Sequence, residues 1–271
     1  MNSSGIARQY GLTLVELMIS MVLGLMVVFA IGSILVASNS AVTLSDTLAD
    51  SQEAGRFSAD FMNRQLMRTG FDPNDVGFVA FAPVCIEASE LICNRNSGAG
   101  TGDKIAVRRQ AEAGTGSAVT CYGSALKDST GADISVDVVV TDIYWVEITD
   151  GVGNLRCQSF DEEGTVSANP GDSFGNALSL AAGVIAMHSI YGQSNVGPDD
   201  DTLNVTTYYN ADQVTDWSNV YAIRVAILTE ASSSSGSGRS EKNYQLLDSA
   251  IYQYNDPILR QIFTTTVALA N

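Results

Sequence analysis

The hydrophobic positions in the first 66 residues fall into two regions, a continuous run and a stretch with helical spacing. Residues 14–37 form one apolar run in which Glu16 is the only charged side chain. A run of this length can cross a bilayer as a helix. From residue 44 to residue 66 the apolar positions recur at helical spacing and are interrupted by charged ones. We therefore predict one long N-terminal helix that is apolar in its first half and amphipathic in its second.

The amphipathic half of this helix is expected to continue to about Arg68, with Gly70 as a stop signal. Its two faces differ in composition. The apolar face is expected to contain Leu44, Leu48, Ala54, Phe57, Phe61, Met62 and Leu66. The outward face is expected to carry Asp46, Glu53, Arg56, Asp60 and Arg64. One face should therefore pack on a folded domain while the other points away from it.

Beyond Gly70 the pattern changes to β-branched and aromatic runs separated by glycine-rich loops. The runs that we expect to form strands are 104–109, 134–140, 143–148, 220–228 and 259–269. The segment Asp-Gly-Val-Gly-Asn at 150–154 is expected to be a hairpin turn. The predicted fold class is α+β, with the long helix packed on an antiparallel sheet.

Glu16 is an unusual residue for a membrane helix. A charge at the centre of a bilayer costs roughly 2.5–3.5 kcal/mol on insertion scales. The fourteen Leu, Ile, Val and Phe residues between 14 and 37 favour insertion by about 4–8 kcal/mol in sum. The segment is therefore apolar enough to insert despite the acid.

The basic residues predict how the helix is oriented. Arg8 precedes the apolar run, and the next Lys or Arg is Arg56. This asymmetry predicts a cytoplasmic N-terminus and a C-terminal domain on the other side of the membrane. A cleavable secretory signal is the alternative, but its apolar core usually spans about 7–15 residues.

The net charge limits the classes of partner. The chain has a formal net charge of −16 and a pI near 4.2. A phosphate backbone would be repelled by this field, so nucleic acid is not expected as a partner.

The four cysteines all lie beyond the apolar run, which indicates two disulfides in an exported domain. Four cysteines allow three connectivities, and we favour Cys85–Cys93 with Cys121–Cys157. A zinc site is the rival interpretation, but the chain has no CxxC pair and a single histidine.

The N-terminal residues resemble a known processing signal. Gly11, Leu12, Thr13 and Glu16 lead directly into the apolar helix, an order that resembles the class III signal of type IV pilins and pseudopilins. The resemblance implies that a prepilin peptidase cuts between Gly11 and Leu12 and methylates Leu12. Glu16 would then be the fifth mature residue, able to neutralise a terminal amine in its own or a neighbouring chain. The alternative is that Glu16 merely favours a helix N-terminus, worth about 0.3–1 kcal/mol.

The same resemblance implies a division of the chain. Residues 1–11 would be a cleaved leader, and 12–38 a transmembrane helix. Residues 39–70 would be its amphipathic continuation, and 71–271 a β-rich head in the periplasm or outside the cell.

Four further segments narrow the family. The stretches 52–71, 180–192, 208–228 and 260–271 look like those of PilW-type minor pilins, which are related to the J pseudopilin of type II secretion. The chain ends Leu-Ala-Asn where that family ends Leu-Arg-Asn, so a role for a basic residue there does not carry over.

The family resemblance implies a function and a set of partners. The chain would be a minor pilin that joins other minor pilins in a tip complex, which primes assembly of the major pilin and supports adhesion and twitching motility. In many systems such a complex contacts a large tip adhesin. The chain would reside in the inner membrane before assembly and at the pilus tip afterwards. The alternatives are a type II secretion pseudopilin and a ligand-binding module at the tip.

No set of residues indicates catalysis, so we predict neither an enzyme nor a cofactor. His188 is the only histidine, and its setting in an expected strand indicates a structural role. Asp199, Asp200 and Asp201 are a weak calcium candidate, because adjacent residues of a loop point in different directions and the spaced ligand pattern is missing. We favour a solvated turn at these residues. The aromatic residues Trp217, Tyr221, Tyr208 and Tyr209 are expected in the core, with an exposed docking patch as the alternative.

Overall fold

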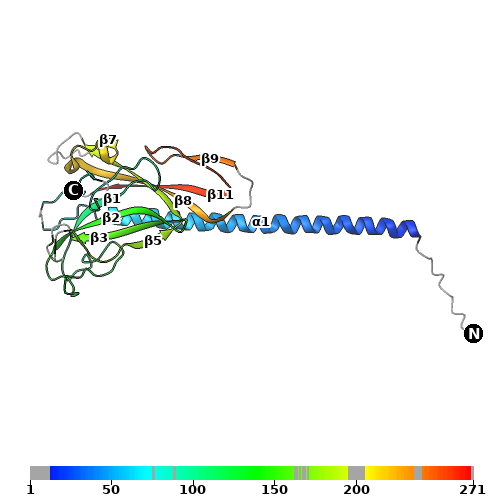
Figure 1. Ribbon diagram of the computed structural model, residues 1–271, viewed down its shortest axis with the longest axis horizontal. Helices are drawn as coiled ribbons and strands as arrows, with labels where there is room; N and C mark the ends of the chain where they lie inside the picture. The colour runs from blue at the N-terminus through cyan, green and yellow to red at the C-terminus, as the bar shows by residue number, and fades with distance from the viewer. Residues whose placement is uncertain are drawn as a thin grey trace, which may run out of the picture. The chain divides into compact units, whose positions relative to one another are not determined.

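The computed structural model describes residues 13–74, 77–87, 90–161, 164, 166, 169, 171–194, 205–234 and 240–269. Gly11, Leu12, Asp199, Asp200 and Asp201 lie outside these residues. The elements, shown in Figure 1, are α1 (Leu14–Leu66), β1 (Ile105–Ala111), β2 (Val138–Thr149), β3 (Val152–Asp161), β4 (Asp172–Ser173), β5 (Leu178–Ala182), β6 (Val184–Ser194), β7 (Val205–Tyr209), η1 (Ala211–Gln213), η2 (Trp217–Asn219), β8 (Val220–Ser234), β9 (Ser240–Tyr244), β10 (Tyr252–Asp256) and β11 (Ile258–Ala268).

The chain divides into two compact units, Met1–Asp46 and Thr47–Asn271. The described part of the first unit is Thr13 and the N-terminal portion of α1. The second unit, called the head here, contains the C-terminal portion of α1 and the described strands.

Local signals set the bounds of α1. The backbone N–H groups of Glu16 and Leu17 donate to the side chain and the carbonyl of Thr13, which is how a helix N-cap satisfies the first turn. No proline interrupts the helix. It ends at Leu66, and the following turns lead to Gly70 with a φ of 78°. Glycine adopts this left-handed conformation without steric cost, which explains why it follows the helix.

The strands of the head form two larger antiparallel sheets and a hairpin (Figure 1). A five-stranded sheet has the order β1-β2-β3-β4, with β5 also pairing with β3. A four-stranded sheet has the order β11-β8-β6-β7, and β9 pairs with β10 in the hairpin. Together with α1, these pairings make the head an α+β fold, as the pattern of the sequence predicts.

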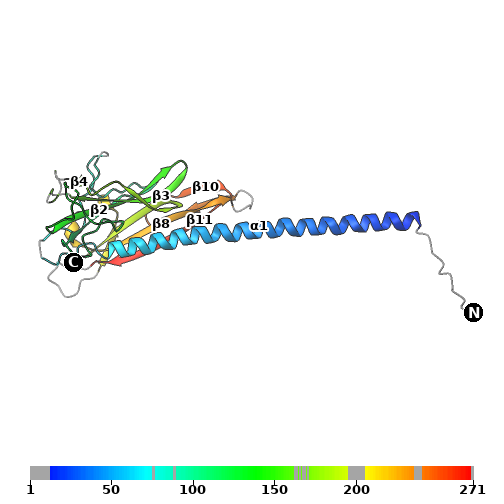
Figure 2. The same cartoon turned by 90° about the horizontal axis from the view of Figure 1, so that it is seen from below.

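The main core joins the helix to both larger sheets. In Figure 1 and Figure 2 the C-terminal portion of α1 lies beside β8 and β11. Met62 and Leu66 of α1 are fully buried with Tyr144 of β2, Leu155 of β3 and Ile223 of β8. This packing fixes the end of α1 against the head.

The longest strands coincide with runs of β-branched and aromatic residues. Three expected strands are present: 104–109 in β1, 220–228 in β8 and 259–269 in β11. The runs 134–140 and 143–148 were expected to be separate, but β2 joins the latter to the end of the former. The joining residue Asp142 is polar yet buried, because it pairs with an arginine of β1.

The hairpin between β2 and β3 confirms the turn expected at 150–154. Thr149 pairs with Val152, so Asp150 and Gly151 form a two-residue loop. Their φ angles are 53° and 80°. Asp-Gly is the favoured sequence for such a turn because both central residues need positive φ.

The face of α1 that packs on the head differs from the expected apolar face. The buried positions are Thr47, Ser51, Gly55, Ser58, Met62 and Leu66. Leu44 is 38% exposed and Phe57 is 46% exposed. The prediction failed for Phe57 because the helix lies close to a sheet there, and small side chains permit the closer approach. Leu44 precedes the first buried position, Thr47, and belongs to the first unit.

Contacts between α1 and the four-stranded sheet show how close this approach is. A Cβ added to Gly55 would lie 2.0 Å from the ring of Phe263 on β11. The Ser51 hydroxyl lies 3.1 Å from that of Thr229 on β8, and Asn63 donates to the Thr265 hydroxyl at 2.9 Å. The Ser51 hydroxyl and the Asn63 amide of α1 thus meet polar partners on the sheet.

A buried ion pair fixes the segment between β1 and β2. The Arg109 Nε donates to Asp142 Oδ2 at 2.7 Å, and both side chains are at most 2% exposed. The other guanidinium nitrogens of Arg109 donate to the carbonyls of Ser117 and Val119. Ser159 of β3 donates its hydroxyl to the second Asp142 oxygen at 2.5 Å. The charges are therefore surrounded by hydrogen-bond partners, as buried ions require.

Two disulfides are present, Cys85–Cys93 and Cys121–Cys157. These are the pairings that we favoured from the sequence. The first closes a loop with a sequence separation of 8, and the second joins residues 36 apart. Cys121 and Cys157 both belong to the main core, so the second bond ties the β1–β2 segment to β3.

We expect loss of Cys121–Cys157 to destabilise the head more than loss of Cys85–Cys93. By loop-closure entropy, the longer loop contributes about 4 kcal/mol and the shorter about 2.5 kcal/mol. The double variants Cys121→Ala/Cys157→Ala and Cys85→Ala/Cys93→Ala should differ by about 1 kcal/mol or more in the free energy of unfolding, measured with denaturant. Equal stability of the two variants would contradict this prediction.

Candidate assembly surface

The N-terminal portion of α1 presents a continuous apolar surface. Its large hydrophobic side chains from Leu14 to Val36 are all exposed, with Leu14 at 76% and Phe29 at 81%. This part of α1 is long and apolar enough to cross a membrane. Contiguous apolar surfaces of this size are covered by lipid or by protein in functional molecules.

The polar residues of this surface are compatible with apolar surroundings. The hydroxyls of Ser20, Ser33, Ser40 and Thr43 donate to backbone carbonyls three or four residues earlier in the helix. Their hydrogen-bonding capacity is thus used within α1. Among the described residues of the first unit before Asp46, only Glu16 has a charged side chain.

Glu16 lies in the first turn of α1 and is exposed. Its backbone N–H donates to the Thr13 hydroxyl at 3.3 Å, which makes Thr13 the N-cap and Glu16 the third helical residue. An acid at this position interacts favourably with the helix dipole. Leu12 lies outside the described residues, so pairing between Glu16 and a mature terminal amine stays a prediction, as do cleavage after Gly11 and methylation of Leu12.

Two glycines interrupt the apolar surface. A Cβ added to Gly24 or Gly32 would meet nothing within 4 Å. Neither glycine is therefore required for packing within the chain as described. Small residues at such positions allow another helix to approach closely.

His188 is fully buried on β6 and has two polar neighbours that the sequence pattern did not reveal. Its Nε2 lies 2.7 Å from the Tyr252 hydroxyl of β10, and its Nδ1 lies 3.2 Å from Asp103 Oδ1. The adjacent Ser189 hydroxyl donates to Asp103 rather than to the imidazole. This geometry gives no serine–histidine pair, and the histidine joins the β9–β10 hairpin to the sheet.

The aromatic residues predicted for the core do not form one cluster. Trp217 packs edge-on against Tyr191, with ring centroids 4.8 Å apart. Tyr221 is buried, whereas Tyr208 is partly exposed beneath the guanidinium of Arg224 at 4.6 Å. Tyr209 is half-buried beside the main core.

The candidate metal ligands give no supported site. Cys85, Glu90 and Cys93 lie together, but both sulfurs are joined in the disulfide and are not available as thiolates. Asp199, Asp200 and Asp201 fall outside the described residues, so the calcium candidate stays a sequence prediction.

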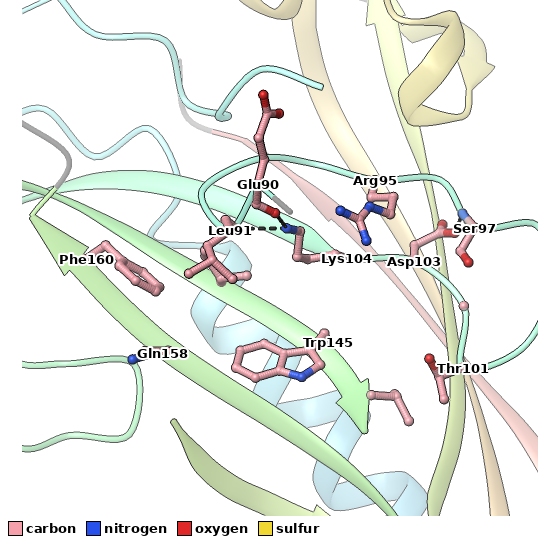
Figure 3. A pocket seen from close by; sticks show the side chains of 13 residues that line it. Glu90, Leu91, Arg95, Ser97, Thr101, Asp103, Lys104, Trp145, Gln158 and Phe160 are labelled. Carbon is pink, nitrogen blue, oxygen red and sulfur yellow. Dashed lines mark hydrogen bonds between the residues drawn. The ribbon is translucent and has the colours of Figure 1, made fainter. Parts of the chain in front are cut away.

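Sequence reasoning missed a cleft on the head. It has a volume of about 340 Å³ and lies between the Cys85–Cys93 loop and strands β2 and β3, with Lys104, Trp145 and Phe160 among its lining residues (Figure 3). These residues come from three separate parts of the chain. Because their meeting depends on strand register, no local pattern could have indicated it.

Comparison with known families identifies two regions of the chain. A family described as type IV pilus-assembly protein W matches residues 143–271, from within β2 to the last residue. The prokaryotic N-terminal methylation motif matches residues 6–31, which include Glu16. No curated protein and no solved structure matches the chain.

Proposed function

We propose that the chain is a PilW-type minor pilin of type IV pili, because residues 143–271 match that family and residues 6–31 match the methylation motif, and that it joins other minor pilins in a complex at the pilus tip. This complex would prime polymerisation of the major pilin and thereby support adhesion and twitching motility. A membrane-anchored pilin that works in pilus assembly contacts other pilus components. The proposal goes further by naming minor pilins, the major pilin and a large tip adhesin as those components.

One observation carries this proposal. The exposed apolar portion of α1 begins with a single acid, Glu16, and carries no other charged side chain before Asp46. In the membrane, lipid would cover this surface, and in a filament other pilin helices would replace the lipid. Repeating a head-to-tail contact produces an open filament where the contact does not close into a ring, and this is the arrangement that the proposal requires.

Orientation and processing complete the proposal. Prepilin peptidase would cut after Gly11 on the cytoplasmic side and methylate Leu12, while the head lies in the periplasm. The disulfides suit that compartment, because disulfides persist in oxidising environments.

The proposal is tested by deleting the gene in the source bacterium and analysing the protein from native membranes. We expect N-terminal peptide mass spectrometry to find methylated Leu12 as the first residue. The deletion strain should lose most surface pili and regain them when the gene is restored. Secretion of exported enzymes should continue at its normal level.

Two results would contradict the proposal. Normal piliation together with blocked secretion would assign the chain to a secretion pseudopilus. An intact Met1 start would exclude prepilin processing and leave an ordinary membrane anchor.

A further inference from the structure

The cleft beside the Cys85–Cys93 loop has an apolar floor and a polar wall that includes the cations Lys104 and Arg95 (Figure 3). Ile143 and Trp145 of β2 and Phe160 of β3 form part of the floor. Ile143 and Trp145 are two residues apart, so their side chains lie on the same face of β2. The pairing of β2 with β3 brings Phe160 close to them. Leu91 of the disulfide loop lies opposite and is 64% exposed.

Lys104 supplies one of the positive charges on the wall. Its ammonium donates to the backbone carbonyls of Glu90 at 2.6 Å and Leu91 at 2.9 Å, as Figure 3 shows. An ammonium group has three N–H donors. Within the described part of the chain two acceptors are recorded for it, so one donor remains for a group in the cleft.

The carboxylates that line the cleft are already used within the protein. Glu90 Oε2 accepts from the Ile86 backbone N–H at 2.7 Å. Asp103 is 2% exposed, and its two oxygens accept from the backbone N–H groups of Ser97 and Ser189. Lys104 and Arg95 line the cleft beside these carboxylates, and Lys104 keeps one N–H donor for an incoming acceptor.

The cleft is also firmly held before any ligand arrives. The disulfide closes the loop, Glu90 bonds back to Ile86, and Lys104 binds the loop carbonyls. Arg95 adds a hydrogen bond to the carbonyl of Glu87 at 3.4 Å. A preorganised site loses less conformational entropy on binding than a flexible one.

From these observations we propose that the cleft binds a carboxylate attached to an aromatic body, with the carboxylate on Lys104 and the ring on Trp145 and Phe160. Aromatic rings favour offset or edge-on packing against other aromatic rings. The volume, about 340 Å³, is at the lower end of the range for small-ligand pockets. This site lies wholly within the head and does not depend on the assembly role proposed above.

The charge state of Lys104 gives the site a pH dependence. Burial, and to a smaller extent the nearby Arg95, lower the pKa of Lys104 to about 8, while Glu90 acts in the opposite direction. A bound carboxylate stabilises the protonated ammonium, so binding takes up a proton wherever Lys104 is neutral. While the ligand carboxylate stays ionised, affinity should therefore be nearly constant below pH 7 and fall as the pH rises through about 8.

The test is titration of the full chain in lipid nanodiscs with N-acetylphenylalanine, followed by calorimetry, with empty nanodiscs as the blank. We expect saturable binding, and about tenfold weaker binding of the uncharged N-acetylphenylalanine amide. Raising the pH from 7 to 9 should weaken binding of the acid about tenfold, because the protonated fraction of Lys104 falls by about that factor.

Variants locate the binding site. Lys104→Met should weaken binding about tenfold, whereas Lys242→Met, in β9 outside the cleft, should leave it unchanged. Because Lys104 also holds the loop, Trp145→Leu provides a second variant that keeps those hydrogen bonds, and it should weaken binding too. Equal binding of acid and amide, unchanged binding by Lys104→Met, or no saturable binding would overturn the proposal.

A further arm of the test identifies the source of the carboxylate. A pentapeptide that ends in phenylalanine with a free carboxylate is added as a competitor. Competition would show that the cleft accepts the C-terminal residue of a polypeptide. Binding of N-acetylphenylalanine without competition would restrict the ligand to a small aromatic acid.

Discussion

Cells that carry only the Glu16→Ala variant should produce few or no surface pili, although the protein is still inserted and cleaved. Removing the acid lowers the cost of placing this segment in the bilayer, so insertion is not impaired. Assembly should fail because a mature terminal amine would lose the carboxylate four residues away. An unpaired charge in an apolar environment is strongly unfavourable.

The measurement compares pili sheared from the cell surface with the amount of protein in the membrane fraction. We expect the sheared fraction to fall at least about tenfold while membrane protein and N-terminal processing stay normal, since tenfold corresponds to only about 1.4 kcal/mol. Glu16→Gln is the matched control, because it keeps the side-chain size and removes the charge. It should behave like Glu16→Ala.

The alternative role of Glu16 predicts a different result. If the acid merely favours the helix N-terminus, its loss costs about 0.3–1 kcal/mol. The exposed Thr13 cap would remain, and α1 continues for 53 residues. Normal piliation by the Glu16→Ala variant would therefore support the helix-start role and contradict the pairing.

The second large effect concerns stability of the head. Arg109→Met should lower the free energy of unfolding by about 3–5 kcal/mol, because it leaves Asp142 buried without its counter-ion. The carbonyls of Ser117 and Val119 would each lose the hydrogen bond from Arg109 as well. Denaturant unfolding of the full chain in detergent, followed by near-ultraviolet circular dichroism of the head, measures the change.

The same substitution at an exposed ion pair is the matched control. Arg64 pairs with Asp60 at 2.9 Å on α1, but both side chains are more than 60% exposed. Arg64→Met should therefore cost less than about 1 kcal/mol. A loss below about 1 kcal/mol for Arg109→Met, or equal losses for the two variants, would contradict the role assigned to the buried pair.

The sequence by itself determined the features that depend on neighbouring residues. The apolar run, its single acid and the absence of proline indicate the long helix, and Asp150–Gly151 indicates the hairpin turn. The even number of cysteines beyond the apolar run indicates two disulfides, which are present. Helix propensity, turn conformation and insertion energy are local properties, so they can be read from short stretches of chain.

Only the tertiary structure decided which residues meet across long separations. It turned the small residues of α1, such as Gly55, toward the sheet and left Phe57 exposed. It also paired Arg109 with Asp142 and brought Lys104 to Trp145 beside the disulfide loop. These contacts depend on strand order, register and the distance between layers. Those quantities are set by packing of the whole head, and no local pattern of residues encodes them.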